Sequence, residues 1–293
     1  MSATNLMNNI PKPEENTNIG LYSGPQSTHA ILGSGSESTR TIIDSDAQEN
    51  SHSTIEEIPD TEAKDEDTGS GTPHPEAHID AKDVEGSTVL HRAAEVGITS
   101  EVKILLDRGA GLEVKNSSGL TALGCAASNG HDTIVKLLLD WGANIENQDI
   151  HGSTALCCAA FSGHDVTVTA LISRGANPDA QGNIGTVALH YAVDGSHSAT
   201  VEALLDGGAN IEKRNNDGWT PLMCAVMYSK YDMVSLLIER GADIESRDKS
   251  GQTALDMATK KGNIGIAKLI QKNRSLVNRT KAALSKLTKP RDK

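Results

Sequence analysis

A periodic arrangement of apolar and polar positions fills the middle of this 293-residue chain. One glycine recurs at a constant spacing of 33 residues, at positions 86, 119, 152, 185, 218 and 251. A leucine follows each of these glycines by four residues, and an alanine follows it by seven. Apolar residues three apart share one face of a helix. The pattern therefore predicts six equivalent units, each with a short first helix that packs through its leucine and alanine.

A second helix is predicted in each unit by a valine and a leucine, again three residues apart. In the first five units these pairs are Val102 and Leu105, Val135 and Leu138, Val168 and Leu171, Val201 and Leu204, and Val234 and Leu237. A Gly-Ala pair closes the same five units, and its glycine suits the left-handed residue that ends many helices. The remaining residues, 144–148 for example, should form an extended finger leading to the next unit. Because each unit buries its apolar face only against its neighbours, the units should stack as a solenoid.

The units resemble the ankyrin repeat. Unit 1 reads Asp83-Val-Glu-Gly-Ser-Thr-Val-Leu-His-Arg-Ala-Ala94, unit 5 keeps Thr220-Pro221-Leu222, and units 2 and 3 keep Gly130-His131 and Gly163-His164. The resemblance implies an all-α ankyrin-repeat solenoid of helix-turn-helix units with β-finger loops, flanked by disordered tails. It covers residues 79–274, with repeats near 83–115, 116–148, 149–181, 182–214, 215–247 and 248–274.

Unit 4 departs most from the shared pattern. It has Gly182 where the other units have Asp or Asn, and Val187 where they have a Thr at the start of the first helix. Ser196 replaces the glycine before its second helix. Losing a Thr cap typically costs about 1 kcal/mol. We therefore predict that unit 4 is the least stable unit of the array.

Charge is distributed unevenly along the chain, whose formal net charge is −12. Residues 1–82 carry 15 Asp and Glu against 4 Lys and Arg, so the Ser- and Thr-rich segment 1–78 is predicted to be a disordered acidic tail. Within it, residues 41–46 (Thr-Ile-Ile-Asp-Ser-Asp) are similar to a SUMO-interacting motif, and Ser53 and Thr54 precede acids as acidophilic kinases prefer. The alternative is a solvated acidic tail without motifs.

The last residues of the chain reverse this charge. Residues 272–293 carry 8 Lys and Arg against 1 Asp. Apolar or small residues recur there at helical intervals, namely Leu276, Thr280, Ala283, Leu284 and Leu287. We interpret 275–293 as a basic tail that includes a C-terminal capping helix. The alternative is a basic handle for acidic lipid or nucleic acid, although the negatively charged middle of the chain argues against a phosphate-binding face there.

Several residues that often carry chemistry are interpreted as structural. His74 and His78 flank a proline, so they lack the helical spacing that places two zinc-binding rings on one face. Cys125, Cys158 and Cys224 occupy one position in the first helices of units 2, 3 and 5, too far apart for a disulfide. With Cys157, they should be reduced packing residues. The resemblance implies that the rings of His91 and His190 tie neighbouring loops together. We expect no catalytic site, metal, cofactor or small-molecule substrate.

The sequence also suggests where the protein resides. Residues 1–10 lack the apolar core of a secretory leader, and no stretch approaches the roughly 18 apolar residues that span a membrane. We therefore expect an intracellular location, in the cytoplasm or the nucleus, and a monomeric protein.

The resemblance also implies a binding face. Ankyrin families generally bind proteins through the fingertips and the exposed side of the first helix, which together form the concave face. The only Phe of the chain, one Trp and one Tyr fall at these positions, between units 3 and 5. The predicted partner-binding residues are Phe161, Ile184, Asp194, Asp217, Trp219, Met227 and Tyr228. The alternative is that the large rings pack against adjacent fingers.

The function predicted from these patterns is a scaffold or adaptor that binds another protein on the concave face. One alternative is tethering to a membrane surface or nucleic acid through the basic C-terminal tail. A second alternative is autoinhibition, in which the acidic N-terminal tail folds back onto the basic C-terminus.

Overall fold

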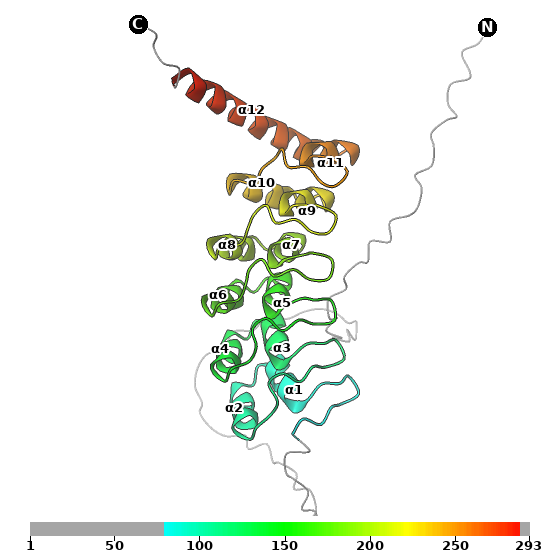
Figure 1. Ribbon diagram of the computed structural model, residues 1–293, viewed down its shortest axis with the longest axis vertical. Coiled ribbons are helices and arrows are strands. Elements are labelled where there is room, and N and C mark those ends of the chain that lie inside the picture. Colours follow the sequence, from blue (N-terminus) through cyan, green and yellow to red (C-terminus); the bar gives the residue numbers. More distant parts are fainter. Residues whose placement is uncertain (1–78, 288–293) are drawn as a thin grey trace, which may run out of the picture. The chain divides into compact units, whose positions relative to one another are not determined.

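The structure is a computed structural model that describes residues 79–287, with only the backbone described for 277, 278 and 280–287. Within these residues the chain forms twelve helices and no strand (Figure 1). The helices are α1 (Val89–Val96), α2 (Thr99–Asp107), α3 (Ala122–Ser128), α4 (Asp132–Asp140), α5 (Ala155–Ser162), α6 (Asp165–Ser173), α7 (Ala188–Asp194), α8 (Ser198–Asp206), α9 (Pro221–Met227), α10 (Tyr231–Glu239), α11 (Ala254–Lys260) and α12 (Ile264–Leu287). The similarities to short motifs at 41–46 and 53–54, and the residues His74 and His78, lie outside the described residues.

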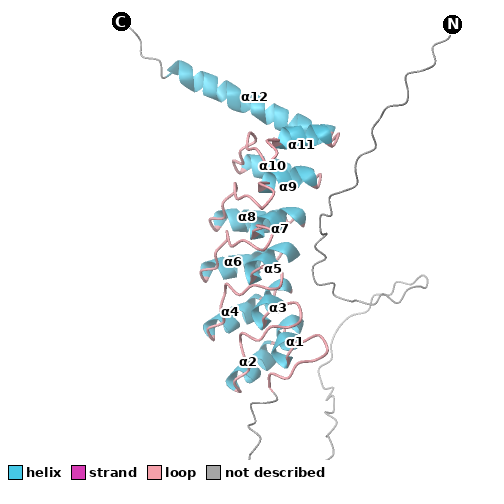
Figure 2. Ribbon diagram, turned by 45° about the vertical axis from the view of Figure 1, so that its right-hand side comes forward, coloured by secondary structure: helices cyan, strands magenta, loops and turns pink. Residues whose placement is uncertain are grey.

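Each unit contributes one pair of helices to a continuous stack. The first helices, α1 to α11 in odd numbers, form one row, and the second helices form a parallel row beside it (Figures 1 and 2). The loops between units project from the row of first helices, away from the second row. Each helix contacts its own partner, and each first helix contacts the first helices of the adjacent units. The stack of helical units predicted from the 33-residue period is thus confirmed.

The core consists of the periodic leucines, alanines and valines. Ala93, Ala126 and Ala159 are at most 2% exposed, as are their equivalents in the later units. An alanine suits this position because its single methyl group lets adjacent first helices approach closely. Leu138, Leu171 and Leu204 of the second helices are completely buried between the two rows.

In five of the six units, the side chain of the residue that starts the finger holds the finger's backbone. The Oδ1 atom of this residue accepts hydrogen bonds of 2.8–3.0 Å from the backbone N–H groups two and four residues later, in Asp83, Asn116, Asp149, Asn215 and Asp248. Adjacent fingers are also joined through their backbones, as where Asn216 N donates to the carbonyl of Ile184 at 3.0 Å. Gly182 of unit 4 has no side chain to make the first kind of bond.

A histidine and a glycine form the junctions between the first three units and their successors. Nε2 of His131, His164 and His197 lies 3.0–3.1 Å from a carbonyl oxygen of the preceding unit, that of Glu95, Ser128 and Phe161 respectively. The same rings lie against Gly97, Gly130 and Gly163, all of which have positive φ. In units 4 and 5 this glycine is replaced by Ser196 (φ 61°) and Ser229 (φ 57°). The sequence analysis noted the first serine and missed the second.

The two ends of the described array differ in polarity. Val89 of unit 1 is 46% exposed, whereas the alanines at its position in α3, α5, α7 and α11 are at most 4% exposed, because the preceding unit covers them. At the other end, Thr259 is exposed where the five earlier units bury an alanine or valine. The C-terminal end of the stack is therefore polar, and the N-terminal end is partly apolar.

Helix α12 does not end at residue 274, where the sixth unit was predicted to end, but continues without a break to Leu287. Arg274 anchors its middle through an ion pair with Glu245, at 2.7 Å. Among the helices that the structure describes, α12 included, none combines the length and the apolar character needed to cross a membrane.

Candidate protein-binding surface

The seven predicted partner-binding residues come from three consecutive first helices and two fingers. Phe161 lies in α5, Asp194 ends α7, and Met227 and Tyr228 lie at the end of α9. Ile184 and Asp217 are fingertip residues of units 4 and 5, and Trp219 follows the second fingertip. We refer to these seven residues as the aromatic–acidic surface.

The seven side chains differ in how much they offer to a partner. Ile184 is 60% exposed and Tyr228 is 43% exposed, and Asp217 is exposed as well. Phe161, Trp219 and Met227 are half-buried and pack against the hydrophobic core. The ring of Tyr228 is thus exposed, whereas the rings of Phe161 and Trp219 pack against their neighbours, as the alternative interpretation states.

Tyr191 joins Phe161 beneath this surface. The two rings meet edge to face, with centroids 6.1 Å apart and planes at 83°. Tyr191 is 7% exposed, its hydroxyl lies 3.3 Å from Oγ of Ser153, and burial raises its pKa. The sequence analysis missed this residue, although it occupies the first-helix position that holds cysteine in units 2, 3 and 5. Tyr191 therefore supports Phe161 from the next unit.

Two carboxylates lie close to Tyr228 and Cys224. Burial raises the pKa of Tyr228, and the negative charges of Asp194 and Asp217 raise it further. The same three causes raise the pKa of the Cys224 thiol to about 12. Among the side chains that the structure describes, those of residues 79–276 and 279, no lysine or arginine forms an ion pair with either carboxylate. The aromatic–acidic surface thus presents two carboxylates that form no ion pair among these side chains, beside an exposed ring.

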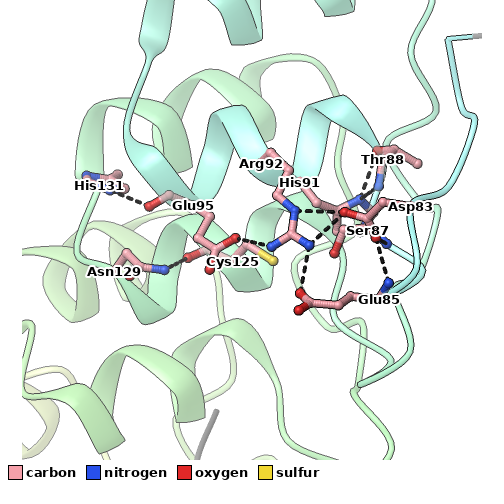
Figure 3. Close-up of polar contacts among 10 residues, drawn as sticks. All are labelled: Asp83, Glu85, Ser87, Thr88, His91, Arg92, Glu95, Cys125, Asn129 and His131. Carbon is pink, nitrogen blue, oxygen red and sulfur yellow. Dashed lines mark hydrogen bonds and ion pairs between the residues drawn. The ribbon is translucent and has the colours of Figure 1, made fainter. Parts of the chain in front are cut away.

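Unit 1 carries acidic residues on the same face, but there they are paired (Figure 3). The guanidinium of Arg92 lies 2.6 Å from Asp83, 2.7 Å from Glu85 and 3.1 Å from Glu95. Hydrogen bonds from Arg92, and from the backbone of residues 85 and 87, hold the pKa of Asp83 below its usual value. The sequence analysis did not identify this cluster.

Comparison with known proteins agrees with the geometry. The family model described as "Ankyrin repeats (3 copies)" matches residues 71–149, 143–215 and 189–281. The chain belongs to the ankyrin-repeat family. Among solved structures, the ankyrin repeat domain of Bcl-3, described as a unique member of the IkappaB protein family, is 29% identical, with a TM-score of 0.60. That match covers 64% of this chain and 87% of the Bcl-3 chain. No curated protein matches.

Ankyrin repeats are generally protein–protein interaction modules, and their fold is typically a non-enzymatic binding scaffold. All four cysteines are free, and burial raises the pKa of each thiol, to about 12 for Cys125. At neutral pH, only a small fraction of such thiols is ionised to the nucleophilic thiolate. Within the described part of the chain, no three His, Cys, Asp or Glu side chains form a group that could hold a metal ion.

The buried histidines of the ankyrin array link adjacent units, as the resemblance implied. Nδ1 of His91 lies 3.1 Å from Thr88 N and 2.9 Å from its hydroxyl, while Nε2 lies 3.0 Å from the carbonyl oxygen of Leu120. His190 makes the equivalent contacts with Val187 N and the carbonyl of Trp219. Each ring therefore fixes the start of a first helix to the next finger, and His190 holds the backbone beside Trp219.

Proposed function

We propose that this protein is an adaptor that holds a segment of a partner protein on its aromatic–acidic surface. The observation that carries the proposal is the exposure of Tyr228 and Ile184 on a face that also presents Asp194 and Asp217, which form no ion pair with any side chain that the structure describes. Exposed aromatic side chains next to complementary charge are typical of binding hot spots. The half-buried Phe161, Trp219 and Met227 give this surface a packed base.

A selection with random short peptides displayed on phage, using the full chain as bait, tests the proposal. The selected peptides are resynthesised, and their dissociation constants are measured with purified variants. Tyr228→Ala and Ile184→Ala suit the test because both side chains are largely exposed, so their removal should cost little folding stability. We expect Tyr228→Ala to weaken binding by about 2 kcal/mol.

Matched controls come from the same chain. Tyr231 is 50% exposed at the start of α10, and Ile104 is 56% exposed on α2, both among the second helices. Tyr231→Ala and Ile104→Ala should leave the dissociation constant unchanged. If they weaken binding as much as Tyr228→Ala and Ile184→Ala do, the aromatic–acidic surface is not the binding site.

Tethering through the C-terminal segment is a second candidate, because α12 continues beyond Arg274 into the basic part of the chain. Binding of the full chain to anionic vesicles, abolished by deletion of 276–293, would favour it. If deletion leaves vesicle binding unchanged, this candidate fails.

A further inference from the structure

Unit 1 shows how this array holds a guanidinium group. Arg92 extends from α1, and its guanidinium contacts Glu85 at the fingertip and Glu95 at the end of the helix, in addition to Asp83 (Figure 3). The cation thus lies on the first-helix face, where one fingertip carboxylate and one helix-end carboxylate both reach it.

The 33-residue period keeps the fingertip carboxylate in unit 5, whereas Met227 stands there at the helix-end position of Glu95. Asp217 occupies the fingertip position of Glu85, and Cys224 occupies the helix position of Arg92. A cysteine side chain ends at Sγ, so it cannot reach the place that the Arg92 guanidinium takes in unit 1. Unit 5 therefore keeps the fingertip carboxylate without the cation.

The second carboxylate comes from unit 4. Asp194 occupies the helix-end position of Glu95, and it precedes Cys224 by the same 30 residues by which Glu95 precedes Cys125. In both places the carboxylate helps to raise the pKa of that thiol, Glu95 for Cys125 and Asp194 for Cys224. Only at Cys125 does a neighbouring arginine oppose this effect.

The lysines that the repeat pattern places nearest to Asp194 and Asp217 make other contacts. Lys261 of unit 6 donates to the carbonyl oxygen of Met227. Lys249 lies in the finger next to Asp217, its backbone N–H donates to the Asp217 carbonyl at 3.3 Å, and its side chain lies beside Gly218. Neither forms an ion pair with Asp194 or Asp217 within the described residues.

We propose that the aromatic–acidic surface binds an arginine side chain of the partner, with the guanidinium over Cys224 between Asp194 and Asp217 and against the ring of Tyr228. This inference rests on the proposed function and names the chemistry of its ligand. Arginine fits better than lysine because a planar guanidinium can donate to two carboxylates at once while it stacks on an aromatic ring. Ile184 then contacts an apolar neighbour of that arginine.

A small probe tests the proposal without knowledge of the partner. N-acetyl-arginine methylamide is titrated into the full chain, and the backbone amide signals of residues 194, 217, 224 and 228 are followed by NMR. We expect saturable shifts at these amides and weaker shifts with the lysine analogue. The double variant Asp194→Asn, Asp217→Asn should weaken binding of the probe about tenfold, because two charge pairs at the surface are lost.

Two further variants sharpen the test. Asp232→Asn removes one exposed carboxylate from α10 and should not change binding of the probe. Arg92→Ala leaves Asp83, Glu85 and Glu95 without their cation, so it should create a second site for the probe in unit 1. New shifts of the backbone amide signals of residues 85 and 95 in this variant would support the use of unit 1 as a model for guanidinium binding in unit 5.

Equal shifts with the arginine and lysine probes, or shifts that survive the double Asp variant, overturn the inference. The adaptor proposal is judged separately by the selected peptides. If the arginine probe fails while peptides without a basic residue still depend on Tyr228, the adaptor function stands and arginine is not its ligand. If no selected peptide depends on Tyr228 or Ile184, both proposals fail.

Discussion

Ser196 and Ser229 take a backbone conformation that glycine takes at the equivalent position of four other units. The reason lies in the following unit. A Cβ atom added to Gly163 would lie 2.5 Å from the ring of His197, and one on Gly130 would lie 2.6 Å from that of His164. Where the following unit has Lys230 or Asn263 instead of histidine, no ring occupies this place. Serine then fits sterically but keeps the cost of a left-handed backbone.

Replacing Ser196 with glycine should therefore stabilise the protein by about 1 kcal/mol, which is the cost of a left-handed conformation for a residue with a Cβ atom. Gly163→Ala should destabilise it by more than this amount, because strain and the contact with His197 act together. Thermal unfolding followed by circular dichroism measures both. Shifts of equal size in the two variants would contradict the role assigned to His197.

The buried histidines make stability depend on pH. Burial lowers the pKa of His190 to about 4, whereas the unfolded chain titrates near its usual value of about 6.5. Between these values the unfolded state binds more protons, so stability falls as the pH decreases from about 6.5 to 4. The full loss is about 3 kcal/mol for this residue. His91, whose pKa burial also lowers, acts in the same direction.

We expect the denaturation midpoint to be constant above pH 7 and to fall between pH 6 and pH 4. His190→Gln keeps an N–H donor for the carbonyl of Trp219 and removes the titrating ring, so this variant should lose part of the decline. A midpoint that is the same at pH 7 and at pH 5 would show that burial of His190 does not control stability. Urea denaturation at a series of pH values supplies the measurement.

At the scale of the elements, unit 4 combines several weak features. Gly182 cannot accept the two backbone hydrogen bonds that Asp or Asn accepts in the other fingers. Val187 replaces a threonine at the start of α7, and Ser196 is strained. Among the described residues, the buried Thr200 hydroxyl of α8 has no hydrogen-bond partner, a feature that unit 4 shares with Thr167 in α6 of unit 3.

Hydrogen exchange should therefore find the amides of α7 and α8 opening before those of α3 to α5. Each feature weakens unit 4 locally, and in a linear array a unit exchanges according to its own stability and its two interfaces. Equal protection in units 2 and 4 would show that the interfaces dominate. The prediction matters for binding because unit 4 supplies Ile184 and Asp194.

At the scale of the whole molecule, the period made the fold predictable. A leucine and an alanine at one helical face recur in six units, and only stacked units can bury them all. The positions of the seven surface residues followed from the same register. Their exposure did not, because the burial of Phe161 and Trp219 depends on rings and fingers from adjacent units. The Arg92 cluster was missed for a similar reason, since it depends on how close a fingertip comes to a helix.

The repeated junction between histidine and glycine has a consequence for how such a protein can change its length. Removing residues 116–148 would bring His164 against Gly97, where it would meet the same backbone that it meets at Gly130. The first units are thus interchangeable. One in-frame duplication or deletion of a unit can lengthen or shorten the array without compensating substitutions. Beyond Ser196 the units are no longer equivalent, so this freedom ends within unit 4, which carries Ile184 and Asp194 of the aromatic–acidic surface.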